Sequence, residues 1–185
     1  MPLKLVHASA ALGAVLALAA WALPLTDWLG GFEASMARHA LLVAVVPALV
    51  APALPARGAP PPVLAAGAEF AVAWGWHLPS AHMAAMTSPA LAVAQQLSFL
   101  LAGLGLWWSA CVVQPLGGTA ALLLTSAHMT MLGAAILLSP RALYPPHDLE
   151  AQMMGAMVML AIVTPAYLLG GLILARRALT EEART

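Results

Sequence analysis

The chain has 185 residues, of which 63% are hydrophobic and only 8% are charged. Its mean hydropathy is +0.92, which excludes an ordinary soluble domain, where about a quarter of the residues are charged. Seven basic and seven acidic residues give a formal net charge of zero, so no basic surface is available for a nucleic-acid partner. The single cysteine excludes an intrachain disulfide and a paired-thiolate metal site.

Six apolar stretches approach or exceed the roughly 20 residues that a helix needs to cross a bilayer. In chain order they are Leu3–Leu25, Ser35–Leu54, Val63–Leu78, Ala90–Val113, Thr119–Ser139 and Gln152–Ala175. Proline-containing breaks separate several of them, and no connection is long enough for a soluble domain. We therefore predict an all-α fold, an integral membrane bundle of about six transmembrane helices in which residues 1–185 form a single domain.

The first stretch has two interpretations. Lys4, followed by an apolar run and then by the small residues near Ala22, could be a cleaved signal peptide. The apolar run extends from Leu5 to Leu25, however, which is longer than a usual signal core. We therefore predict a retained first helix.

The distribution of basic residues predicts the orientation. With six spans, both termini and the second and fourth connections lie on one side of the membrane. That side carries Lys4, Arg57, Arg176, Arg177 and Arg184, whereas the other side carries only Arg38 and Arg141 as basic residues. Because cytoplasmic segments are enriched in lysine and arginine, we predict that the N- and C-termini are cytoplasmic.

Histidine and methionine side chains gather at the predicted outer face. They are Met36, His39, His77, His82, Met83, Met86, His128, Met129, Met153 and Met154. Thioether and imidazole groups suit copper(I), and polar groups inside a bilayer usually mark a site or a pathway. The pattern predicts a copper site whose core is His39, His77 and His128, with Met36, Met129 and Met153 as possible soft partners.

The same residues allow other interpretations. Methionine fills irregular gaps in apolar cores, and a histidine in a loop, such as His82 or His147, needs no ligand role. Two histidines that face each other across the bundle, His39 with His128 or His77 with His128, could instead hold a haem, as in a membrane electron carrier. Glu69, the one carboxylate inside a span, could belong to a polar path in a copper or proton transporter, or could be protonated and hydrogen-bonded. We rank both of these alternatives below the copper site, because the spans lack the paired broken helices of many transporters.

Several ordered stretches carry a family resemblance. They are Met36–Leu42 followed by Pro47, Trp76–Pro79, Phe99–Gly103 leading to Trp107 and Trp108, Ser126–Met129 followed by Leu132–Ala134 and Leu143–Pro145, and the residues Glu150, Gln152 and Gly155. Together they are similar to the multi-pass CtaG family of cytochrome c oxidase assembly factors. The resemblance covers roughly residues 36–171.

The resemblance implies a multi-pass protein of the bacterial inner membrane that is not an enzyme. Such a protein would bind copper at its periplasmic face and support metallation of cytochrome c oxidase. Its partners would be oxidase subunits or periplasmic copper chaperones, besides the lipid bilayer. Glu150 and Gln152 would then support the metal site or face the client protein.

The sequence departs from the family pattern at several positions. The family often has histidines in the helix where Ala92 and Gln96 stand here. Ala151 replaces the first glutamine of the expected pair, and Val158 and Met159 replace a Met-Trp pair. Because glutamine is a poor copper ligand, these departures indicate a site with fewer imidazoles or a greater share of methionines.

Overall fold

The computed structural model describes residues 2–112 and 115–182, and all regular structure in that part of the chain is helical. Among the described residues, five helices are long and apolar enough to cross a membrane. They are α1 (Leu3–Ala22), the continuous run Gly31–Ala53, α7 (Pro89–Val112), α8 (Pro115–Leu137) and α9 (Leu149–Glu182), of which Leu149–Thr180 forms the candidate span. The run Gly31–Ala53 consists of α3 (Gly31–Ala40), the π-helical segment η1 (Leu41–Val45), α4 (Val46–Val50) and the 3-10 turn η2 (Ala51–Ala53). The predicted all-α membrane bundle is confirmed.

A sixth long helix, α5 (Pro62–His77), corresponds to the third predicted span but has only 16 residues. At 1.5 Å per residue it is about 24 Å long, shorter than the roughly 30 Å of a hydrocarbon core. Two short helices, α2 (Leu25–Leu29) and α6 (Pro79–Thr87), complete the described part. Three residues used in the sequence predictions lie outside the described residues. They are Val113 at the end of the fourth predicted span, Gln114 in the break after it, and Arg184 in the charge pattern.

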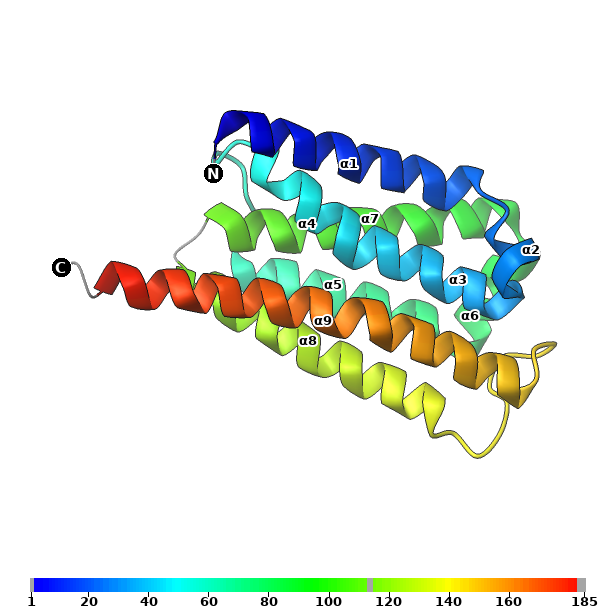
Figure 1. Cartoon of the computed structure of the whole chain (residues 1–185). Coiled ribbons are helices and arrows are strands. Elements are labelled where there is room, and N and C mark those ends of the chain that lie inside the picture. The colour runs from blue at the N-terminus through cyan, green and yellow to red at the C-terminus, as the bar shows by residue number, and fades with distance from the viewer. Residues whose placement is uncertain (1, 113–114, 183–185) are drawn as a thin grey trace.

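The long helices lie side by side and alternate in direction along the chain (Figure 1). The start of α1 and the end of α9 lie at one end of the bundle, together with the connection between η2 and α5; we call this the terminal end. The opposite end holds residues 23–30, 78–88 and 138–148, and we call it the histidine end. This arrangement agrees with the predicted grouping of both termini on one side.

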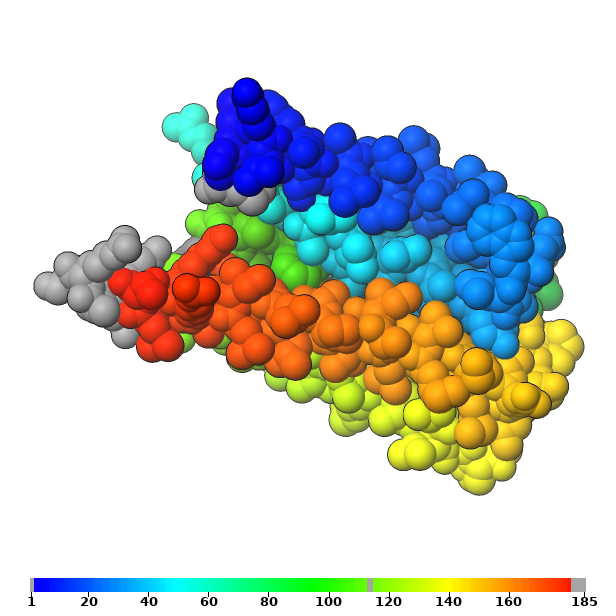
Figure 2. Space-filling model, in the orientation of Figure 1, coloured from blue at the N-terminus to red at the C-terminus, as the bar shows by residue number. Residues whose placement is uncertain are grey.

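Helix α1 lies at the edge of the bundle and packs on α4. Gly13 allows this approach, because a Cβ atom there would lie 2.7 Å from Val50 Cγ2. The Ser9 hydroxyl donates to the Leu49 carbonyl at 2.8 Å, and Arg38 Nε donates to the Ala20 carbonyl at 2.7 Å. Figure 2 shows α1 and α9 diverging toward the terminal end, with α4 and α7 visible in the hollow between them. Cleavage or retention of α1 stays a prediction.

A proline creates the irregular segment in the second membrane helix. Pro47 has no N–H, so the carbonyl of Val43, four residues earlier, cannot accept the usual α-helical hydrogen bond, and the helix widens into η1 just before it. The Tyr167 hydroxyl of α9 donates to this carbonyl at 2.8 Å. Gly103 of α7 packs against the same carbonyl, where any Cβ atom would collide with it. One backbone oxygen therefore joins three membrane helices.

We expect Tyr167→Phe to destabilise the bundle by about 1–3 kcal/mol, because the buried Val43 carbonyl then loses its hydroxyl donor. The measurement is the free energy of unfolding in mixed detergent micelles. Thr87→Val is the matched control, since the exposed Thr87 hydroxyl bonds only to carbonyls of its own helix. Equal stabilities for the two variants would contradict the role assigned to Tyr167.

Candidate metal centre

The structure brings two of the three predicted core histidines together. His39 of α3 and His77, the last residue of α5, have ring centroids 4.9 Å apart and perpendicular ring planes. Phe99 of α7 stacks on the His39 ring at 4.8 Å. His39 is 1% exposed and His77 is 5% exposed, so both imidazoles lie inside the bundle close to the histidine end.

The hydrogen bonds of this pair leave nitrogen lone pairs available. His77 Nδ1 lies 2.6 Å from the Ala73 carbonyl, and because a carbonyl only accepts, Nδ1 carries the proton. Nε2 of a neutral His77 is then a lone-pair donor, and it has no hydrogen-bond partner among the described residues. Neither nitrogen of His39 has a partner there. A backbone carbonyl that orients one ring nitrogen while the other stays available is the usual arrangement of a metal-binding histidine.

Two further histidines lie in an aromatic cluster next to the pair. His82 of α6 contacts Tyr144 and Phe32, with ring-centroid distances of 4.8 and 5.4 Å, and Phe32 lies 5.5 Å from His147. The Tyr144 hydroxyl donates to the His77 carbonyl at 2.8 Å, which ties this cluster to the end of α5. The histidine end therefore groups four imidazoles, of which sequence analysis included only two in the proposed core.

His128 has a different partner. Its Nε2 lies 2.9 Å from Glu69 Oε2, and Glu69 is fully buried in the middle of α5. Glu69 precedes His77 by eight residues, so the two positions are about 12 Å apart along the helix axis. Within residues 2–112 and 115–182, no three side chains of His, Cys, Asp or Glu come close enough to form a metal site by themselves.

The predicted methionine partners differ in position. Met36, one turn before His39 on α3, and Met129, next to His128 on α8, are both fully buried. Met153 is 40% exposed, because the buried face of α9 runs through Gln152 and Ala156 and directs Met153 out of the bundle. Met36 is therefore the predicted thioether that shares the buried face of its helix with a histidine of the pair.

The aromatic residues that surround the pair were not among the residues that the sequence pattern predicted for the site. Phe99 and Tyr144 were identified only as parts of family-like stretches, although each contacts or bonds a histidine of the pair. Gln152 also has a clear role, since its side-chain N–H donates to the Ile136 carbonyl at 3.0 Å and its oxygen accepts from the Leu143 N–H at 2.6 Å. These bonds hold the connection that carries Tyr144. Glu150, in contrast, is exposed.

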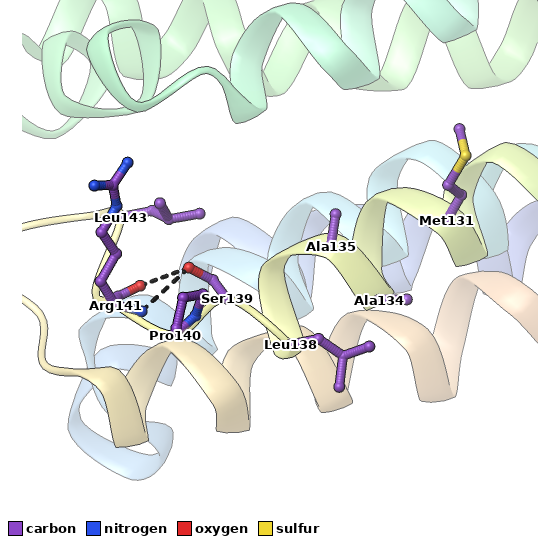
Figure 3. A pocket seen from close by; sticks show the side chains of 8 residues that line it. All are labelled: Met131, Ala134, Ala135, Leu138, Ser139, Pro140, Arg141 and Leu143. Atoms are coloured by element: carbon purple, nitrogen blue, oxygen red, sulfur yellow. Dashed lines mark hydrogen bonds between the residues drawn. The ribbon is translucent and has the colours of Figure 1, made fainter.

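A surface hollow of about 660 Å³ at the end of α8 is separate from this centre. Figure 3 shows its lining, which includes Met131, Leu138 and Arg141, and the hydrogen bonds between Ser139 and the backbone of Arg141. The lining includes none of the six predicted ligands. The hollow therefore offers a shallow, mostly apolar surface rather than a ligand set.

The burial of His82 predicts that the stability of the protein depends on pH. Burial, with charge repulsion from His77 and His147, lowers the pKa of His82 from 6.5 to about 4. The unfolded chain therefore binds the proton more readily, and stability that is complete above pH 6.5 is lost as the pH falls toward 4. The difference between the pKa values of the unfolded and folded states corresponds to roughly 3 kcal/mol of unfolding free energy.

We expect His82→Phe, an aromatic substitution within an aromatic cluster, to flatten the dependence of unfolding free energy on pH between 6.5 and 4. The measurement is detergent unfolding at a series of pH values. His7→Phe is the control, because His7 is exposed on α1. An unchanged pH slope in His82→Phe would contradict the expected protonation of His82 on unfolding.

Comparison with known proteins identifies the family. A family model described as cytochrome c oxidase caa3 assembly factor (Caa3_CtaG) matches residues 6–181. No curated protein and no solved structure shows significant similarity to the chain. Because the family match covers nearly the whole sequence, this membrane-helical chain belongs to the cytochrome c oxidase caa3 assembly factors.

Proposed function

We propose that the protein binds copper between His39 and His77 and supports metallation of a cytochrome c oxidase. The family match establishes the assembly-factor class, and the metal, its ligands and a non-catalytic role are our proposal. Copper is the cargo in this proposal, held for transfer to an oxidase subunit or received from a periplasmic copper chaperone.

The observation that carries the proposal is the pair of adjacent buried imidazoles with unbonded nitrogens. An imidazole nitrogen buried without a hydrogen-bond partner costs free energy. A metal ion bound at His77 Nε2 and at one nitrogen of His39 would remove this cost for His77 and for one of the two unpartnered nitrogens of His39. The backbone bond at His77 Nδ1 already fixes the ring orientation that such binding needs.

The ligand types favour copper(I) over harder ions. Two neutral imidazoles and a thioether from Met36 form a soft, uncharged set, whereas magnesium or calcium would need oxygen ligands. The only carboxylate buried in the described bundle, Glu69, is already paired with His128 at another depth. His128, Met129 and Met153 are therefore left out of the proposed copper site.

The proposed direction of delivery follows from charge. Lys4, Arg57, Arg176 and Arg177 belong to segments at the terminal end. By the positive-inside rule this end faces the cytoplasm, so the histidine end faces the periplasm. His82 and His147 lie in the cluster next to the pair, on the side from which a periplasmic donor would approach.

The alternative of a haem held by His128 together with His39 or His77 is not favoured by the geometry. His128 Nε2 is already paired with Glu69 at 2.9 Å, whereas His39 and His77 are in edge-to-face contact with each other at 4.9 Å. An optical spectrum of the purified protein distinguishes the two proposals, because a bound haem would give a Soret band.

We expect purified protein loaded with copper under reducing conditions to retain about one copper ion per chain and to show no Soret band. His39→Leu with His77→Leu should lose this copper, because both nitrogen ligands are removed while apolar volume is kept. The measurement is metal analysis after removal of loosely bound ions.

His7→Leu is the matched control, since it removes an exposed histidine of α1 and should leave the copper content unchanged. Detergent unfolding of the double variant shows whether the bundle is intact. Full copper retention by a folded double variant would contradict the proposed site.

In cells, we expect the oxidase to be assembled without its full copper content when this protein is absent. The His39→Leu, His77→Leu variant should reproduce that deficiency, whereas His7→Leu should restore normal content. The measurement is the ratio of copper to haem in the isolated oxidase. A normal ratio in the deletion strain would show that the protein assists assembly in another way.

A further inference from the structure

A second feature, separate from the histidine pair, is a groove of about 570 Å³ between α5 and α8. Its size is typical of sites for small organic ligands. Small residues form much of its floor, and exposed apolar side chains form its rim, so it opens on the lipid-facing surface of the bundle. The lining residues are Pro62, Val63, Ala66, Gly67, Phe70, Gly117, Ala120, Ala121, Leu124, Thr125 and His128.

Two buried polar groups line this otherwise apolar groove. His128 is 9% exposed, and its Nδ1 has no hydrogen-bond partner in the described part of the chain. Thr125, three residues earlier on the same face of α8, is fully buried, and its hydroxyl is also unpartnered there. Unpaired polar atoms inside a membrane bundle are costly, so they indicate a ligand that offers hydrogen bonds.

The Glu69–His128 pair defines the kind of hydrogen bond that the ligand can make. If His128 Nε2 donates to the Glu69 carboxylate, His128 Nδ1 is an acceptor. If a protonated Glu69 donates to Nε2, Nδ1 carries the hydrogen and is a donor. His128 Nδ1 can therefore accept a hydrogen bond from a ligand hydroxyl in the first arrangement and donate one to a ligand carbonyl in the second.

The depth of these groups restricts the ligand further. His128 lies about 14 Å along α8 from the end of that helix at the histidine end, and Glu69 lies in the middle of α5. The charged headgroup of a phospholipid stays at the membrane surface and does not reach this depth. The groove continues toward the terminal end past Gly67 to Pro62 and Gly117, which gives space for an apolar tail.

We propose that the groove binds a prenylated quinone or quinol, with its ring oxygen hydrogen-bonded to His128 and its tail lying between α5 and α8. A quinone presents a carbonyl and a quinol presents a hydroxyl, which matches the two arrangements of the Glu69–His128 pair. The ring is uncharged, so it resides at mid-membrane depth. The proposal is independent of copper binding at His39 and His77.

The test is binding of a benzoquinol with a decyl tail to the protein in lipid nanodiscs, with empty nanodiscs subtracted. Gly67→Leu places a side chain in the groove, and nothing lies within 4 Å of a Cβ atom added at Gly67. Gly75→Leu is the matched control on α5, since a Cβ atom there is equally unobstructed and Gly75 is not among the groove-lining residues. We expect saturable binding to the unchanged protein and to Gly75→Leu, and its loss in Gly67→Leu.

The hydrogen bonds to the quinol ring are tested separately. Thr125→Val keeps the side-chain shape and should weaken quinol binding by about tenfold, because a buried hydroxyl partner is removed. Decylcyclohexane, which has the tail but no oxygen, should not displace the quinol.

Equal binding to Gly67→Leu and Gly75→Leu would overturn the proposed location. Displacement by decylcyclohexane would overturn the quinol class and identify the groove as a general hydrocarbon site. Detergent unfolding of Gly67→Leu confirms that lost binding does not reflect lost structure. Copper retention by the same variant should be normal, which distinguishes failure of this proposal from failure of the copper proposal.

Discussion

The bundle depends on how it satisfies the carbonyl that Pro47 leaves without a helical donor. In a bilayer no water is present to supply the missing hydrogen bond, so another helix must supply it. Tyr167 donates from α9, and α7 approaches the same oxygen at Gly103. Three membrane helices are thereby fixed to one another one turn from His39. His39 thus lies on a helix that is held at this junction rather than on a loop, which suits a ligand that must keep a set position.

Polar side chains of α5 meet their partners at two levels along the helix. His77 meets His39 at the histidine end, and Glu69 meets His128 two turns deeper. The backbone bond from His77 Nδ1 to the Ala73 carbonyl leaves Nε2 as the free nitrogen of His77. The upper level combines unbonded imidazoles with neighbouring aromatic rings, whereas the lower level opens on an apolar groove. One short helix thus supplies polar groups to two chemically distinct environments.

Sequence patterns predicted the helices well and the contacts less completely. The predicted segment Val63–Leu78 agrees with α5 to within one residue at each end, because Pro62 starts the helix and Pro79 ends it. Depth along the spans correctly indicated that His39 and His77 are near each other. The same reasoning placed His128 and Met153 in the site. His128 instead pairs with Glu69 at a deeper level, and Met153 is exposed because a depth estimate does not say which way a side chain points around its helix.

Length, hydropathy and charge determined by themselves that this chain is an all-α membrane bundle, and its motifs indicated the family. Those properties are local, since each depends on residues close together in the chain. The partner of each buried polar group depends instead on helix rotation and close packing, which residues far apart decide together. Only the tertiary structure therefore paired His39 with His77 and His128 with Glu69, and turned Met153 outward.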